Sequence, residues 1–89
     1  MLSPSTFSRI VHVTEQALEE VPTLNVIGRV TIIRSYAQLL ALDPSFKEYE
    51  QKLAKALLDL ARIANGSEKS ELITRIQALV EAINSESRS

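Results

Sequence analysis

Residues 23–42 decide the fold class, and they read TLNVIGRVTIIRSYAQLLAL. Apolar side chains recur along this stretch at spacings of four, three, four and three, at Val26, Val30, Ile33, Ala37 and Leu40. Such a seam is expected of helices that pack side by side. A second seam, turned by about a third of a revolution, contains Ile32, Tyr36 and Leu39. The stretch therefore predicts a helix that contacts neighbours on two sides.

A strand is the alternative for part of this stretch, because residues 29–36 are rich in β-branched side chains. Strict alternation of apolar and polar residues is absent, and both seams continue well beyond the length of a strand. The periodicity therefore favours a helix. The polar wedge left on this helix is narrow and consists of Gly28, Thr31, Arg34, Ser35 and Gln38.

Three further helices follow from single apolar stripes and from the residues that interrupt them. Pro22 ends the first helix, and Asp43 is expected to cap the third, with Pro44 at its first position. Gly66 favours an exit from the third helix, and Ser67 caps the fourth. The predicted helices span residues 4–20, 23–42, 44–64 and 67–84, followed by a frayed tail at residues 85–89.

The connections between these segments are short, which favours antiparallel packing of consecutive helices. The expected fold is all-α, an antiparallel four-helix up-down bundle in a single domain over residues 1–89. The apolar stripes of the first and third predicted helices include Val11, Phe46 and Leu58. A chain of this size buries about 60% of its unfolded surface, so dimerisation is a favourable way to complete the bundle. Alternatively, the fourth helix packs on another chain.

The composition argues against several classes of function. Ten Lys and Arg against eleven Asp and Glu give the 89 residues a formal net charge of −1, so no strong field favours nucleic acid or an anionic membrane. The absence of cysteine excludes disulfides and thiolate chemistry. No stretch is apolar enough to span a bilayer, and residues 1–5 lack the pattern of a signal peptide. We therefore expect a cytoplasmic protein without a membrane or nucleic-acid partner.

Side chains that could carry catalysis are few. His12 is the single histidine, and it is predicted to be exposed in mid-helix, where phosphotransfer modules place their phosphoacceptor. Those modules have a lysine three residues later, whereas this chain has Glu15, whose charge repels a phosphoryl group. The carboxylates are predicted on solvated faces, and neither metal-ligand spacing nor a glycine-rich phosphate loop occurs. We therefore predict no enzymatic activity, no cofactor and no metal site.

A DNA-associated regulator that uses the third and fourth helices is an alternative function. Residues 60–76 have a loose helix-turn-helix character. However, Gly66 follows Ala61 by five residues instead of the usual four. The second helix of the motif would also carry Glu68 and Glu71, whose carboxylates repel phosphate groups.

Residues 30–40, VTIIRSYAQLL, resemble the first helix of the dimerisation and phosphoacceptor domain of sensor histidine kinases, and residues 44–64 resemble its second helix. The resemblance implies an antiparallel hairpin that pairs with a second copy. Leu24 stands where the family has its phosphoacceptor histidine, Asn25 where an acidic residue follows, and Arg29 where the family has proline. No catalytic residue is carried over, and a signalling hairpin without a phosphoacceptor is a further alternative.

The leading prediction is a small non-enzymatic helical module for protein–protein interaction or oligomerisation, such as an adaptor, an assembly factor or a small subunit. The expected partner is a protein, in a homodimer or a larger complex. If the first seam of residues 23–42 faces the core, the second is left for this partner. The candidate interaction surface is therefore Arg29, Ile32, Tyr36 and Leu39, with Tyr36 at its centre. The alternative is that the fourth helix covers this seam.

Overall fold

A computed structural model of the chain describes residues 1–64 and 70–87. Within these residues the chain forms four α-helices and no β-strand: α1 (Pro4–Glu20), α2 (Leu24–Leu42), α3 (Lys47–Ala64) and α4 (Ser70–Ser87). The prediction of an all-α fold is confirmed. Residues 29–36, for which a strand was the alternative, lie in the middle of α2.

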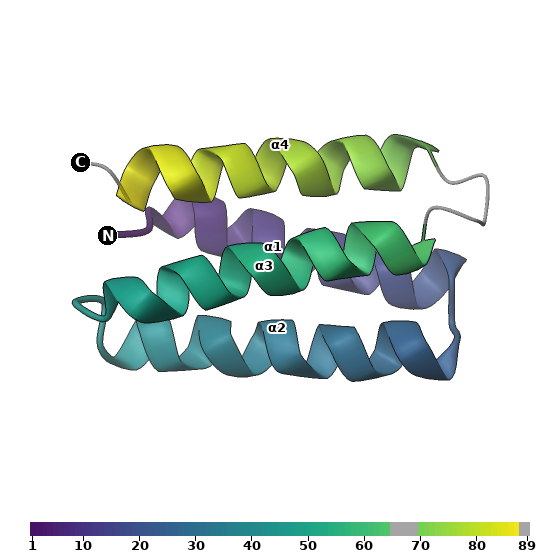
Figure 1. Cartoon of the computed structure of the whole chain (residues 1–89), viewed down its shortest axis with the longest axis horizontal. Helices are drawn as coiled ribbons and strands as arrows, with labels where there is room; N and C mark the ends of the chain where they lie inside the picture. The colour runs from purple at the N-terminus through teal and green to yellow at the C-terminus, as the bar shows by residue number, and fades with distance from the viewer. Residues whose placement is uncertain (65–69, 88–89) are drawn as a thin grey trace.

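The helices lie side by side along the long axis of the molecule (Figure 1). Each helix contacts the next one in the sequence, and α4 also contacts α1. The result is an elongated helical bundle of 35 × 20 × 18 Å. The start of α1 and the end of α4 lie at the same end of this bundle (Figure 1). Among the described residues, no helix has the length and apolar character that crossing a membrane requires.

Local contacts explain where α1 and α2 begin and end. The Ser3 hydroxyl accepts a 3.2 Å hydrogen bond from the backbone N–H of Thr6, and proline follows at the first helical position, where a missing N–H costs nothing. Pro22 prevents α1 from continuing, because proline disfavours helical geometry in the preceding residue. The Thr23 hydroxyl then caps α2 by accepting a 3.3 Å bond from the N–H of Val26.

The predicted start of the third helix at residue 44 is wrong, because Asp43 does not cap α3. The Asp43 N–H donates a 2.9 Å hydrogen bond to the Leu39 carbonyl, so Asp43 is the C-cap of α2. Its carboxylate accepts hydrogen bonds from the N–H and the hydroxyl of Ser45, at 3.2 and 2.6 Å. This Asx turn engages the side chain that was expected to cap the next helix. As a result, α3 begins at Lys47.

The fourth helix also departs from its predicted bounds of 67–84 and the frayed tail expected at 85–89. It spans Ser70–Ser87, so the chain stays helical beyond residue 84. Hydrogen bonds from the start of α1 hold this last turn. The predicted exit at Asn65-Gly66 and the cap at Ser67 lie outside the described residues.

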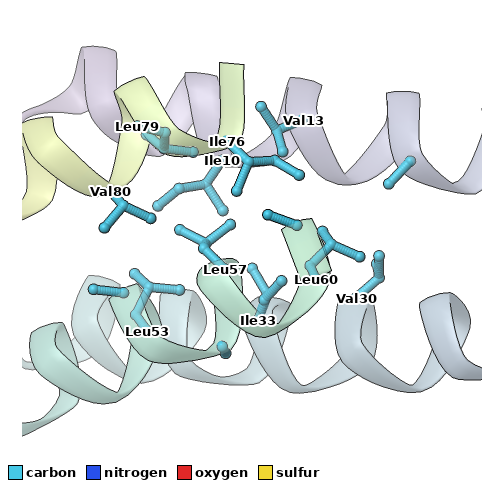
Figure 2. Close-up of a cluster of buried hydrophobic side chains, with 14 of the residues drawn as sticks. Ile10, Val13, Val30, Ile33, Leu53, Leu57, Leu60, Ile76, Leu79 and Val80 are labelled. Carbon is cyan, nitrogen blue, oxygen red and sulfur yellow. The ribbon is translucent and has the colours of Figure 1, made fainter. Parts of the chain in front are cut away.

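The core is built by all four helices, and it includes the first seam of α2. Figure 2 shows side chains that meet there, among them Ile10, Val13, Val30, Ile33, Leu53, Leu57, Leu60, Ile76, Leu79 and Val80. Three side chains that were predicted in apolar stripes are exposed instead: Val11, Phe46 and Leu58. Val11 and Leu58 each follow a buried residue by one position, which is about 100° around the helix, and Phe46 lies in the turn before α3.

Glu86 ties the end of α4 to the start of α1. Its carboxylate accepts hydrogen bonds from the Ser3 N–H at 2.7 Å and from the Thr6 hydroxyl at 2.5 Å. Burial raises the pKa of Glu86, but the hydrogen bonds from Thr6 and Ser3 favour the charged form and outweigh it. The pKa of Glu86 is therefore lowered.

This lowered pKa predicts a pH dependence of stability. Ionised Glu86 stabilises the fold at pH values above the pKa of an unfolded glutamate, about 4.3, and this contribution is lost as the pH falls through the folded pKa. We expect Glu86→Gln to be less stable than the native chain at pH 7 and to lose less stability between about pH 5 and about pH 3. Urea unfolding at a series of pH values measures this effect. Glu81→Gln, which changes an exposed carboxylate on α4, is the control, and identical pH profiles for the native chain and Glu86→Gln would contradict the prediction.

Candidate functional site

The four residues of the predicted interaction surface lie on α2, but they do not share one environment. Ile32 and Leu39 are exposed. Tyr36 is half-buried, and its ring lies 6.0 Å from the ring of Tyr49 on α3. Arg29 reaches toward α3, where its guanidinium lies 3.7 Å from the Asp59 carboxylate. Ile32 and Leu39 are therefore open to a partner, whereas Arg29 and Tyr36 contact α3.

Arg29, Ile32 and Tyr36 line a groove between α2 and α3 of about 300 Å³, which we call the α2–α3 groove; its α3 side consists of Lys52, Lys55, Ala56 and Asp59. Three of the four charged side chains that line this groove, Arg29, Lys52 and Asp59, have an oppositely charged partner close by. Glu48 binds Lys52 at 3.2 Å, and this hydrogen bond raises the pKa of Lys52. The Asp59 carboxylate contacts Arg62 as well as Arg29. The α2–α3 groove is thus a polar edge of the bundle that is open to solvent.

A second groove of about 410 Å³, the α1–α2 groove, is more apolar, and the sequence analysis does not anticipate it. Its lining consists of Phe7, Ile10, Val11, Arg34, Ala37, Gln38 and Ala41. The groove exists because Ala37 and Ala41, one helical turn apart, are too small to fill the space beside α1. These two alanines on the α1 side of α2 are the sequence signal that could have revealed it.

The third surface of α2 faces solvent between the two grooves, and we call it the outward face; Ile32, at its edge, also borders the α2–α3 groove. Its members follow one another at helical spacings and are all exposed: Leu24, Gly28, Ile32, Ser35, Leu39 and Leu42. Leu24 and Leu42 are 87% and 84% exposed. The charged residues of α2, which the structure describes in full, are Arg29 and Arg34, and these line the two grooves. The outward face is therefore uncharged over its whole length.

The hydroxyl groups on and beside the outward face are engaged within α2. Thr31 donates a 2.9 Å hydrogen bond to the carbonyl of Ile27, and Ser35 donates one of the same length to the carbonyl of Thr31. A hydroxyl whose proton is bound in this way loses less on leaving water than a free one. Gly28, Thr31 and Ser35 belong to the predicted polar wedge, but the internal hydrogen bonds of Thr31 and Ser35 make this side of α2 easier to desolvate.

His12 is exposed on α1, as predicted for the alternative of phosphotransfer. It lines a hollow between α1 and α4 together with Arg9 and Arg75, cations that sequence spacing alone does not bring to it. The Arg75 guanidinium is bound by Glu71 at 2.6 Å and donates to the Gln16 side-chain carbonyl at 2.9 Å. This hollow is open to solvent, and Arg75 is already paired with Glu71.

The surface required for the DNA-binding alternative lies over α3 and α4. The structure pairs Arg62 with Asp59 and Arg75 with Glu71, so the described part of these helices does not present a cluster of unpaired cations. Glu68 and Gly66 of the proposed helix-turn-helix lie outside the described residues. Nothing in the geometry of α3 and α4 favours DNA over another partner.

Glu50 is a buried carboxylate that the sequence analysis does not single out. It is 1% exposed, and neither carboxylate oxygen has a hydrogen-bond partner among the described residues. The amino group of Met1, itself largely exposed, lies 3.5 Å from one oxygen. Glu50 precedes Leu53 by three positions and Leu57 by seven, so the helical register alone could have placed it on the core side of α3.

Metal binding finds no support in the arrangement of acidic and histidine side chains. Within residues 1–64 and 70–87, no three of them come together as a metal ion requires.

No protein-family model, curated protein or solved structure matches this chain. The resemblance of residues 30–64 to a histidine-kinase hairpin therefore stays a prediction, and the function has to be argued from the geometry of the chain itself.

Proposed function

We propose that this chain is a small non-enzymatic module that binds a protein partner through the outward face of α2. The observation that carries the proposal is the uncharged, exposed seam from Leu24 to Leu42. At 1.5 Å per residue, the seam is about 28 Å long. Several exposed leucine and isoleucine side chains along one uncharged helix face are apolar surface that a partner can bury, and such surface marks an interaction site.

The sequence of α2 supports the proposal, because this helix carries apolar residues on its exposed side as well as on its core side. Val26, Val30 and Ile33 pack in the core, while Ile32 and Leu39 point to solvent. Helices that are apolar all round are normally buried on all sides. A partner that covers the outward face would give α2 the environment to which its composition is suited.

The bundle offers a rigid platform for such binding. We propose the antiparallel up-down topology for its four helices, and the short connections at residues 21–23 and 43–46 support this topology. In that arrangement α2 is fixed along its core side by both neighbours, so a partner meets a preformed surface and little ordering is required on binding. The cytoplasmic location expected from the sequence is part of the proposal.

Photo-crosslinking in the cells that make this protein tests the proposal. A photoreactive phenylalanine analogue at position 39 should give covalent adducts, and the same residue at position 77, exposed on α4, should not. Adding Ile32→Lys to the position-39 protein should lower the adduct yield at least tenfold, because a desolvated unpaired charge costs several kcal/mol. Adducts at both positions, or at neither, would overturn the proposal.

Ile32 is a better position for this test than Tyr36. The Tyr36 ring packs against Tyr49, so a charge at position 36 would disturb the contact between α2 and α3. Ile32 is exposed, and its replacement by lysine leaves the core unchanged. Circular dichroism of Ile32→Lys should therefore match that of the native chain.

A further inference from the structure

We infer that the partner of the outward face is a second copy of this chain, whose α2 packs antiparallel on the first about a two-fold axis near Ser35. This inference rests on the proposed function and specifies its partner. The same surface would then be used on both copies, which is the arrangement of a two-fold dimer.

The spacing of the outward face is what makes it self-complementary. Gly28 lies seven positions before Ser35, and Leu42 lies seven positions after it. Ile32 lies three positions before Ser35, and Leu39 four after it. When two such helices run in opposite directions about Ser35, Leu42 of each copy comes to the level of Gly28 of the other. Ile32 of each copy likewise meets Leu39 of the other.

The sizes of the facing residues fit this register. Leu42 projects from the surface, being 84% exposed. At Gly28, a Cβ atom built on the backbone would meet nothing within 4 Å, so the backbone there is open and leaves room for a large side chain of a facing helix. Large residues opposite small ones are how helices interdigitate. A parallel register would instead set Leu42 against Leu42 at one end and leave two glycines facing a gap at the other.

The polar groups of the seam do not oppose its burial. The small Ser35 side chain would allow the helices a close approach at the axis, and its hydroxyl already donates to the Thr31 carbonyl. Arg29 and Arg34 line the two grooves at the edges of α2, so neither charge would be trapped between the copies. A face without charge also meets its own copy without repulsion.

The size of the contact sets the expected affinity. One face of a single 19-residue helix buries less than the roughly 800 Å² per partner of a standard interface. We therefore expect an equilibrium between monomer and dimer in the micromolar range, with the dimer favoured as the concentration rises.

Cysteine cross-linking tests the register directly, because the native chain has no cysteine. Ser35→Cys should form a disulfide-linked dimer on mild oxidation, since the two-fold axis brings like residues within the 4.4–6.8 Å between Cα atoms that a disulfide needs. An equimolar mixture of Gly28→Cys and Leu42→Cys should give the mixed disulfide at least tenfold over either like pair, read by mass spectrometry. Gln77→Cys, at an exposed site on α4, is the control for random collision.

The outcomes separate this inference from the proposed function. Disulfides of Gly28→Cys with itself and of Leu42→Cys with itself, in place of the mixed species, would overturn the antiparallel register. Cross-linking no greater than that of Gln77→Cys, together with a monomeric mass by light scattering at several hundred micromolar chain, would overturn self-pairing. If adducts to a different protein at position 39 persist in that case, the interaction function stands with another partner; if they too are absent, both proposals fall.

Discussion

Replacing Leu57 with alanine is expected to lower the free energy of unfolding by about 2–5 kcal/mol, the range for a large apolar side chain removed from a packed core. Leu57 is 0% exposed and lies among side chains from all four helices (Figure 2). The loss combines the transfer free energy of the deleted atoms with the cavity they leave, because neighbouring helices relax only in part. In a chain of 89 residues, this is a large part of the total stability.

Leu58→Ala is the matched control for this prediction. Leu58 is the same residue type on the same helix, one position later, and it is 40% exposed. We expect its replacement to cost about 1 kcal/mol or less. Urea unfolding followed by circular dichroism measures both variants. Equal losses for the two variants would mean that α3 is rotated about its axis, so that Leu57 and Leu58 are buried to the same extent.

The second large effect is expected at Glu50, where Glu50→Met should raise the free energy of unfolding by about 1–3 kcal/mol. A buried carboxylate without hydrogen-bond donors destabilises the folded state, because it has lost its hydration without replacement. The amino group of Met1 at 3.5 Å is largely exposed, and an ion pair with one exposed partner restores little of this loss. Methionine matches the length of glutamate and suits an irregular apolar site.

Glu48→Met is the control for the Glu50 variant, because Glu48 lies in the same first turn of α3 but its side chain is exposed. Its replacement removes the pair with Lys52 and should lower stability by about 0.5 kcal/mol or less. Thermal and urea unfolding compare the variants with the native chain. A lower stability of Glu50→Met would show that the ion pair with the amino group of Met1 is worth more than the burial of the carboxylate costs.

The two faces of α2 connect stability with function. Its core side contributes Val26, Val30, Ile33 and Leu40 to the bundle, and substitutions there should unfold the chain. Its outward face does not contribute to the core, so substitutions there should change association while the fold persists. This separation makes the proposed interaction testable without the ambiguity of unfolding.

The sequence by itself determines the number and type of the helices, because these depend on local chemistry. Pro22 and the Thr23 hydroxyl separate α1 from α2 through contacts within a few residues, and the spacing of apolar residues marks one side of each helix. The departures at residues 43–46 and at the end of α4 come from contacts that the local pattern does not contain. Asp43 bonds within its own turn, and Glu86 bonds to residues 80 or more positions away.

Only the tertiary structure decides which apolar side of α2 is buried and which remains for a partner. The sequence of α2 carries two neighbouring seams of similar apolar character, and the order of residues along one helix is the same whichever seam faces inward. The choice is made by where α1 and α3 lie: they flank the seam of Val30 and Ile33, draw Tyr36 and Arg29 toward α3, and leave Ile32 and Leu39 in solvent. Whether a side chain is buried depends on the residues around it. Residues that are distant in the sequence are brought there by the packing of the whole bundle.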